Sequence, residues 1–531
     1  MIASPPSRQT LVGSASARRH APTVAIVGAG PGGLATAMLL ASAGCRVTIV
    51  EARDRVGGRT RRIEANAGGR RFAFDCGPTF FMMPYVLEEI FASTGRRLAD
   101  YAELTRLDPM YRLLLGRDGG RPPLTIDTTQ DLSRMAAQLA AIEPSDGPAF
   151  LRFIADNRRK LGLMTPILRS PIRSVTDLLT WDGMRVAPTL QPWRSLYDLL
   201  ASYFRNEQIR LALAFQSKYL GMSPFECPSL FSILPFIEYE YGIWHPRGGC
   251  NALTQAMARA CVELGVSIRC NAAVDRLLFD GRRCVGIGKA DEEERFDHVV
   301  LNADATWALK HLIPERLRGG WTDRRIDSQR YSCSTFMMYL GVRGHVALPH
   351  HTIYTSASYR ENIDDIAIHG RMSEDPSVYV CNPSPIDPTL APEGDSSLYV
   401  LVPTPNTSTP RGGGPPIDWT TAAPTLRERA YRQLEGIFGI DDIRKRVLSE
   451  TLLTPADWRS ERINHGATFN LAHTLPQMLH RRPHHRLQGF DGLWLVGGGT
   501  HPGSGLPVIF LSAQITASLL CKEAGVGTDS R

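Results

Sequence analysis

Three glycines near the start of the chain have the spacing that brings a polypeptide backbone close to a phosphate. Gly28, Gly30 and Gly33 follow the apolar run Val24–Val27 in the pattern G-x-G-x-x-G. Gly28 permits a tight turn, Gly30 leaves the backbone open to a pyrophosphate, and Gly33 lets the next helix pack close to the strand. The free N–H groups and positive dipole end of that helix attract the phosphates.

An acidic residue, Glu51, stands about 20 residues further on, where a carboxylate can accept hydrogen bonds from a ribose hydroxyl. It ends a second apolar strand, Arg46–Val50, which follows a helical run at Leu34–Ala43. A glycine pattern alone is weak evidence, because ordinary βαβ units also turn on glycine. Strand, glycine loop, helix, strand and acid in this order predict a dinucleotide site.

A second glycine pair, Gly57 and Gly58, follows directly and is flanked by Arg55 and Arg59. Two glycines let the backbone turn close to a ligand. Arg59 would add a charge-assisted hydrogen bond to a phosphate. The alternative is a surface turn with solvated arginines, which this position, directly after the dinucleotide pattern, makes the weaker interpretation.

A third glycine-rich loop, Gly497–Gly505, lies near the other end of the chain. It connects an apolar strand, Leu493–Val496, to a helix with Pro507 in its first turn, a favoured place for proline. Backbone N–H groups at such a helix start bind a pyrophosphate. We therefore expect ligand contacts from Gly499, Gly505, Leu506 and Val508. Two such loops at opposite ends of the chain indicate a ligand longer than a mononucleotide.

Length and composition restrict the class of protein. At 531 residues the chain is expected to form two to four domains of about 150 residues each. A hydrophobic content of 43% and a charged content of 21% are typical of a folded soluble protein. The net charge of +7 favours anionic surfaces, but no nucleic-acid motif is present, so no nucleic-acid partner is expected.

The ten cysteines are scattered, with no C-x-x-C pair and no zinc-type spacing. They predict reduced thiols in a reducing compartment and no metal centre. No uninterrupted apolar run approaches the roughly 18 residues of a membrane span. Residues 1–22 contain arginine, serine and proline but no acid, as transit peptides do. Because they lack a clear amphipathic face, a disordered extension is expected.

Two further regions, a second sheet and a helical region, are expected to support these motifs. Strand-like runs at 111–115, 335–342 and 396–403 predict a second, mostly antiparallel sheet, and residues 403–424 are expected to form a loop. From Asp131 to about Leu220 the pattern is helical. Within it, residues 150–175 mix apolar with basic side chains, which is typical of a membrane interface or of an ordinary surface helix pair.

Aromatic and apolar residues form two groups that either line an apolar pocket or pack in the core. Phe80, Phe81 and Met82 follow the turn at Gly77-Pro78, and the aromatic segment 215–249 includes Phe215 and Trp244. Glu238 and Glu240 are expected at the rim of such a pocket. His245 and His501 are the acid–base candidates, although each lies in a Gly/Pro loop, where hydrogen bonding to the backbone is the favoured interpretation.

Together these motifs resemble the bacterial phytoene desaturase family of carotenoid desaturases, which includes diapophytoene desaturases and related carotenoid oxidases. The first glycine loop with Arg55–Arg59 is shared by a wider flavoprotein superfamily that includes amine oxidases, whereas Gly497–Gly505 is a narrower signature. The segments Phe215–Pro224 and Trp244–Gly249 also match the family's pattern. The similarity spans roughly residues 24–520. One departure is Pro507–Leu511, where many phytoene desaturases carry a more glycine-rich helix start, so the individual member of the family stays open.

The resemblance implies an α/β fold and non-covalently bound FAD, with the strand around Val274 contacting the adenine through its backbone. The expected parts are a discontinuous Rossmann-like FAD-binding domain (23–100, 245–310 and 485–525), a β-sheet substrate domain (101–130 and 311–484) and a helical, membrane-facing region (131–244). Phe80, Phe81, Met82, Phe215 and Trp244 are the expected substrate contacts.

The function implied is FAD-dependent desaturation of a long apolar polyene, of phytoene or diapophytoene type, by hydride transfer to the flavin. The flavin would carry the chemistry, with oxygen or a quinone as electron acceptor. The protein would be cytoplasmic and peripherally attached to the membrane. Three alternatives stay open: an oxidase of carotenoid terminal methyl groups, an amine oxidase, and a non-enzymatic prenyl carrier like the Rab GDP-dissociation inhibitors.

Overall fold

Side chains on both faces of strand β1 (Thr23–Val27) are buried, as in the central strand of a parallel sheet. In the computed structural model, which describes residues 21–117 and 119–527, β1 is the middle of a five-stranded parallel sheet. The strand order is β19 (Leu493–Leu495), β13 (His298–Leu301), β1, β2 (Arg46–Val50) and β9 (Ser267–Arg269). The sheet therefore draws on three distant parts of the chain. Residues 1–20 of the expected N-terminal extension lie outside the described residues.

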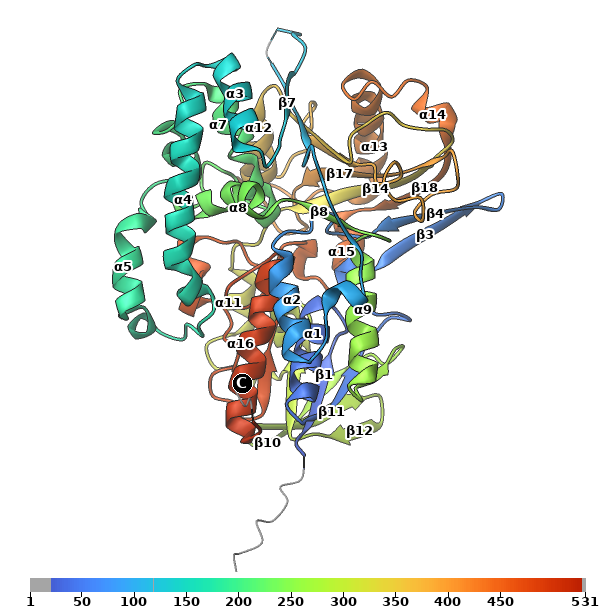
Figure 1. The fold of residues 1–531 in the computed structure, drawn as a ribbon. Helices are drawn as coiled ribbons and strands as arrows, with labels where there is room; N and C mark the ends of the chain where they lie inside the picture. Colours follow the sequence, from blue (N-terminus) through green and yellow to red (C-terminus); the bar gives the residue numbers. More distant parts are fainter. Residues whose placement is uncertain (1–20, 118, 528–531) are drawn as a thin grey trace, which may run out of the picture.

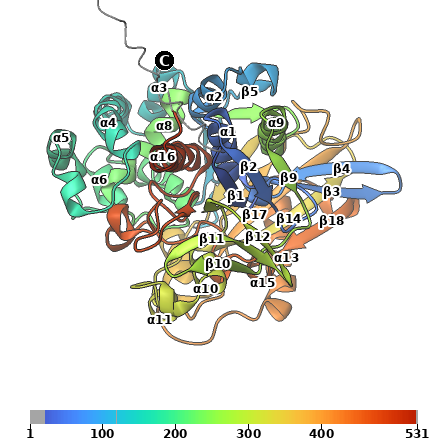
Figure 2. The same cartoon turned by 90° about the horizontal axis from the view of Figure 1, so that it is seen from below.

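Helices cover one face of this sheet and a smaller sheet covers the other (Figures 1 and 2). On the first face α1 (Pro31–Ser42) packs between α9 (Cys250–Glu263) and α16 (Leu506–Ala524). On the second face lie β10 (Arg276–Asp280), β11 (Arg283–Lys289), β12 (Glu292–Arg295) and α10 (Ala305–Leu312). All carboxyl ends of the parallel strands consequently open toward the upper half of the molecule.

The C-terminal helix α16 is long and apolar enough to cross a membrane by length and composition. Within the described residues it is the one helix that meets this criterion, and 56% of its apolar window is buried inside the protein. It packs against α1 and α2 (Pro84–Ser93). A core helix has the same properties, so the criterion alone does not make α16 a membrane span.

A second, seven-stranded sheet lies at the upper right of Figure 1. Its order is β18 (Val447–Leu453), β14 (Ser334–Val342), β17 (Ser396–Thr404), β16 (Val378–Cys381), β15 (His351–Thr355), β6 (Arg112–Leu115) and β7 (Leu124–Asp127). All neighbours are antiparallel except β15 and β6, which confirms the predicted mostly antiparallel sheet. Helix α13 (Trp419–Gly436) covers one face, and the hairpin β3–β4 (Arg62–Ala67, Arg70–Asp75) packs on the other.

The predicted loop at 403–424 is wrong at both ends. Strand β17 continues to Thr404, and α13 begins at Trp419 with Pro424 inside it. The helix starts before the proline because Asp418 caps it, accepting a hydrogen bond from the Thr420 N–H at 3.0 Å. Burial of Trp419 then fixes the first turn in the core.

The predicted helical region is confirmed and lies at the left of Figure 1. It contains α3 (Leu132–Ile142), α4 (Asp146–Leu168), α5 (Trp181–Leu190), α6 (Leu196–Ala201), α7 (Glu207–Ala212) and α8 (Ile233–Tyr241). The apolar side chains of α4, such as Phe153, Ile154 and Leu161, are buried in the protein's own core. The interpretation of residues 150–175 as a membrane-facing apolar stretch is therefore wrong for these side chains.

Short elements complete the described chain: β5 (Leu104–Arg106) pairs with β8 (Trp244–Pro246), and α11 (Asp323–Asp327), α12 (Tyr359–Asp364), α14 (Ile443–Arg446) and α15 (Pro455–Ser460) sit in the connections. Strand β8 leads directly into α9. It therefore connects the helical region to the parallel sheet.

Replacing Gly33 by alanine should destabilise the fold. A Cβ atom there would lie 2.3 Å from the Gly28 carbonyl oxygen and 2.8 Å from Asn302 Nδ2. Such overpacking costs about 1–3 kcal/mol. Gly162→Ala is the matched control, since Gly162 is also helical but has open space around it, and should gain up to about 1 kcal/mol from helix propensity. Chemical denaturation midpoints measure both; an equal change in the two variants would contradict this packing.

Candidate functional site

The first glycine loop is held against the end of β13. Gly28 has φ +103°, and a Cβ atom there would lie 2.6 Å from the Asn302 carbonyl oxygen. The Asn302 side-chain amide donates to the Gly28 carbonyl oxygen at 3.0 Å. Gly30 is the N-cap of α1, and this helix has no side-chain N-cap among the described residues. The loop therefore presents backbone rather than side chains to a ligand, as its spacing predicts. Asn302 was not singled out from the sequence.

Glu51 fastens the loop from the other side. Its Oε2 accepts a hydrogen bond from the Ala29 N–H at 2.7 Å, and its Oε1 accepts one from the Arg53 N–H at 3.0 Å. Both bonds organise the backbone next to the expected ligand. Because each carboxylate oxygen has two lone-pair sites, Glu51 keeps the capacity to accept from a ribose hydroxyl.

The second glycine turn lies directly on the first. The Gly57 N–H donates to the Ala29 carbonyl oxygen at 2.9 Å, and a Cβ atom at Gly58 would be 3.3 Å from Gly30 Cα. Arg59 is turned to a different segment, where its guanidinium donates to the Thr468 carbonyl oxygen. The two loops thus form one continuous backbone surface, and Arg59 ties it to the C-terminal part of the chain.

The third loop brings a second helix start to the same place. Gly505 (φ +116°) is the N-cap of α16, again without a side-chain cap. A Cβ atom at Gly32, in the first turn of α1, would lie 3.1 Å from Ile509 Cγ2, in the first turn of α16. Two uncapped helix N-termini therefore adjoin at the carboxyl ends of the parallel strands, which is the arrangement that attracts the two phosphates of a dinucleotide.

The remaining predicted cofactor residues border this surface. A Cβ atom at Gly499 would clash with Ala305 Cβ at 2.5 Å, Leu506 is buried and Val508 half-buried. The expected strand around Val274 is wrong, because Val274 lies buried in the connection between β9 and β10. In that connection the Ala272 N–H donates to the Glu51 carbonyl oxygen at 2.8 Å. All the predicted cofactor positions thus lie at the same edge of the sheet.

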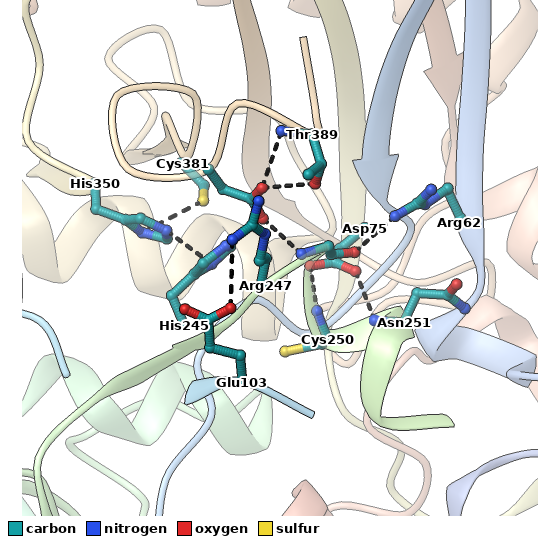
Figure 3. A network of polar contacts seen from close by, with 12 residues as sticks. Arg62, Asp75, Glu103, His245, Arg247, Cys250, Asn251, His350, Cys381 and Thr389 are labelled. Atoms are coloured by element: carbon teal, nitrogen blue, oxygen red, sulfur yellow. Dashed lines mark hydrogen bonds and ion pairs between the residues drawn. The ribbon is translucent and has the colours of Figure 1, made fainter. Parts of the chain in front are cut away.

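A buried carboxylate that sequence reasoning missed joins this region to the second sheet (Figure 3). Asp75, at the end of β4, accepts hydrogen bonds from the Cys250 N–H at 2.8 Å and the Asn251 N–H at 2.9 Å. It therefore caps α9 from another element. Burial raises the pKa of Asp75 to about 6. The motif D-C-G-P alone gives no indication of this long-range cap.

The predicted substrate residues Phe80 and Phe215 share one aromatic cluster, formed by Phe80, Tyr111, Phe215, Tyr219 and Tyr379. Ring centroids are 5.3 Å apart for Phe80 and Tyr219 and 5.4 Å apart for Phe215 and Tyr111. The other three predicted residues lie beside it: Phe81 and Trp244 are bridged by a backbone hydrogen bond of 2.9 Å, with Met82 next in the chain.

Glu238 lies against this cluster and is fully buried, so its predicted place at a rim is wrong. Its Oε2 accepts hydrogen bonds from Tyr111 OH at 2.7 Å and Gln216 Nε2 at 2.9 Å. Burial raises its pKa to about 7. The Tyr219 hydroxyl also interacts with the Glu238 carboxyl group and lowers its pKa, whereas Gln216 Oε1 has no hydrogen-bond partner among the described residues. Glu240 is half-buried and is paired with Arg158 at 2.6 Å.

The two candidate acid–base histidines lie in different surroundings. His501 Nε2 bonds to the Ile167 carbonyl oxygen at 3.1 Å, and burial lowers its pKa to about 4, so it is a neutral structural residue. His245 bonds to side chains rather than to the backbone: Asp387 at 2.8 Å and His350 at 3.0 Å. Neither histidine has a hydrogen bond to the aromatic cluster among the described residues.

Known proteins share this sequence and architecture. The sequence pattern of the flavin containing amine oxidoreductases matches residues 31–521. A 4,4'-diapophytoene desaturase (4,4'-diapolycopene-forming) of Methylomonas sp is 40% identical over 94% of this chain and 95% of its own length. An all-trans-zeta-carotene desaturase of Myxococcus xanthus is 41% identical over 95% and 94%.

Solved structures agree at the level of the fold. An oxidoreductase from Methanosarcina mazei matches with a TM-score of 0.61 and 16% identity, over 94% of this chain and 99% of its own. The sequence identity to these desaturases, and the share of both chains over which it extends, are high enough to assign the chain to their family. The chain therefore belongs to the family of flavin containing amine oxidoreductases and, within it, to the carotenoid desaturases.

Proposed function

We propose that this protein is an FAD-dependent desaturase that removes hydrogen from a long acyclic polyene of the phytoene or diapophytoene class in carotenoid biosynthesis. The observation that carries the proposal is the short link between the glycine loops and the aromatic cluster. Gly77 packs so closely on Arg59 that a Cβ atom would lie 2.6 Å from the Arg59 carbonyl oxygen. Phe80 follows three residues later, within about 10 Å along the chain.

FAD fits the residues at the sheet edge. The glycines leave free the space that a Cβ atom would fill, and the starts of α1 and α16 offer uncapped N–H groups to a diphosphate. Gly28, Gly30 and Glu51 would hold the adenosine half, and the turn at Gly57–Arg59 with the loop at Gly497–Gly505 would hold the other half. When bound, FAD supplies a two-electron acceptor for hydride.

The aromatic cluster is the place for the polyene. Its rings offer the apolar surface that a substrate without polar groups requires, and their π faces stabilise positive charge. Removing hydride from an allylic carbon leaves such a charge on the substrate. The carboxyl group of Glu238, whose pKa burial raises to about 7, lies against these rings and in its ionised form can take the proton lost from the neighbouring carbon.

The segment around α5 supports attachment to a membrane. Five large apolar side chains there are 56–79% exposed: Val175, Leu179, Trp181, Met184 and Trp193. Exposed tryptophans with nearby arginines, such as Arg173 and Arg185, are typical of a surface that lies in the bilayer interface. We propose that this patch attaches the protein to the cytoplasmic face of the membrane, in whose apolar interior polyene substrates dissolve. Oxygen or a quinone would be the final electron acceptor.

Glu238 should make both stability and turnover depend on pH. The folded protein raises its pKa from 4.5 to about 7, so this group's contribution to stability is complete below about pH 4.5 and is lost as the pH rises through 7. Glu238→Gln removes this pH-dependent loss of unfolding free energy, which amounts to at most about 3 kcal/mol. The variant should therefore denature at a higher midpoint than wild type above pH 7, and its turnover should fall by about 100-fold.

Glu240→Gln is the matched control on the same helix, because a surface ion pair contributes less than about 1 kcal/mol. Denaturation at several pH values and steady-state turnover measure both variants. A wild-type pH profile that Glu238→Gln leaves unchanged would remove Glu238 from the mechanism.

The function itself is tested by product analysis. Purified FAD-loaded protein is incubated with vesicles that contain phytoene or diapophytoene, and the pigments are separated by chromatography. A desaturase lengthens the chromophore of at least one substrate, whereas a terminal-methyl oxidase adds oxygen without lengthening it. The double variant Trp181→Ser/Trp193→Ser should slow the reaction in vesicles and leave that of detergent-solubilised substrate unchanged. Failure to convert either polyene would reject the proposed function, and equal rates in vesicles would reject the membrane patch.

A further inference from the structure

Three metal-binding side chains meet in the second sheet, away from the cofactor loops. His350 and His351 stand at the start of β15, and Cys381 ends β16 as the direct cross-strand partner of His351. All three are buried. One ring nitrogen of each histidine and the Cys381 sulfur lie within 4.8 Å of one another. We propose that they form a binding site for a divalent cation of the zinc class, whose ligand His351 also contacts Phe80 and Tyr379 of the aromatic cluster.

The distances suit one ion. His350 Nδ1 lies 3.1 Å from His351 Nε2 and 3.8 Å from Cys381 Sγ. One ion can bind all three atoms only when His351 and Cys381 approach closer than the bound of 4.8 Å, because at that bound the equidistant point would lie midway between their ligand atoms and leave no tetrahedral angle. Zinc binds histidine nitrogen at about 2.0–2.1 Å and thiolate sulfur at about 2.3 Å. Small side-chain shifts therefore complete the coordination.

Second partners fix both imidazoles in the orientation that a metal requires. His350 Nε2 lies 3.0 Å from His245 Nδ1 (Figure 3). In turn, His245 Nε2 lies 2.8 Å from Asp387 Oδ2. His351 Nδ1 lies 2.7 Å from Tyr379 OH. When each ring donates its outer N–H along these contacts, the lone pairs of His350 Nδ1 and His351 Nε2 face the proposed ion. Metal-binding histidines are held in this way by carboxylates and other acceptors.

The charges also match. Burial lowers the pKa of His350 and His351 well below the usual value, so both are in the neutral form that binds a metal. Zinc with one thiolate carries a single positive charge, and the Asp387 carboxylate behind His245 balances it. Without an ion, burial raises the pKa of the Cys381 thiol, and a bound cation reverses that shift.

Space for one further ligand adjoins the cluster. A cavity of about 10 Å³, lined among others by Asp75, Thr79, His350 and Cys381, is close to the size of one water molecule. A water there completes four-coordination. The ion would fasten β15 to β16 and, through His245, to strand β8, which leads into α9 of the FAD-binding part. Its role is structural: it locks the substrate sheet onto the cofactor-binding part.

The test is metal analysis of the FAD-loaded protein purified from zinc-supplemented culture, followed by replacement with Co²⁺. We expect close to one zinc per chain. The cobalt form should show the thiolate-to-cobalt charge-transfer band and the intense visible bands of a four-coordinate site. Cys381→Ala should lose the metal and the charge-transfer band, whereas Cys227→Ala, which removes an equally buried thiol outside the cluster, should keep both.

Flavin content and circular dichroism of each variant show that it is folded. His350→Gln should also lose the metal, and a chelator should lower the melting temperature of wild type but not of Cys381→Ala. Wild-type protein without bound zinc that also fails to take up cobalt would overturn the proposal, leaving a hydrogen-bonded chain of imidazoles. A cobalt charge-transfer band that persists in Cys381→Ala would overturn it as well.

Discussion

The close approach of backbone to backbone at the carboxyl ends of β1 and β13 is the constraint on which the rest of the molecule depends. Gly28 and Gly33 are in contact with Asn302 and with each other at distances that leave no room for a Cβ atom. This packing fixes the position of the start of α1, where the diphosphate of FAD is proposed to bind. Glu51 holds the first glycine loop by accepting a hydrogen bond from the Ala29 N–H. The second glycine turn and the start of α16 adjoin the same surface, so one compact backbone arrangement forms the proposed cofactor site.

The substrate side is coupled to that surface through few, buried polar contacts. Asp75 holds the start of α9 from the end of β4, and Tyr399 OH donates to the Gly77 carbonyl oxygen at 2.8 Å. The segment from Gly77 to Phe80 thereby has a fixed course between the glycine turn and the aromatic cluster. Glu238 stays buried there because Tyr111 and Gln216 satisfy one of its oxygens. Desolvation and these hydrogen bonds together leave a carboxyl group that titrates near neutral pH.

Local patterns allowed the cofactor half to be predicted, since glycine spacing, strand hydrophobicity and Glu51 all act over short stretches of chain. Strands β6, β14 and β17 of the second sheet could also be predicted from their apolar runs, whereas its other strands could not, and Pro424 concealed the start of α13. The burial of Glu238 could not be predicted, because it depends on the packing of segments that are distant in the chain. Its one sequence signal is an acid inside the apolar run Ile237–Tyr239.

The same limit applies to the proposed membrane patch and the proposed metal site. Residues 150–175 have an amphipathic composition, but tertiary packing buries their apolar side, and the exposed patch begins only at Val175. Cys381 is 30 residues from His351 in the chain and becomes its neighbour through the pairing of β15 with β16. No spacing rule for consecutive ligands detects such a site. Long-range strand pairing and helix packing are therefore what the sequence patterns leave undetermined.

The most direct test of the account is flavin reduction by the polyene alone. FAD-loaded protein is mixed, without oxygen or any other acceptor, with vesicles that contain phytoene or diapophytoene, while absorbance spectra are recorded. We expect the visible flavin band to bleach in step with the appearance of a longer polyene chromophore. A primary amine should leave the flavin oxidised. Bleaching by the amine, with none by either polyene, would contradict it.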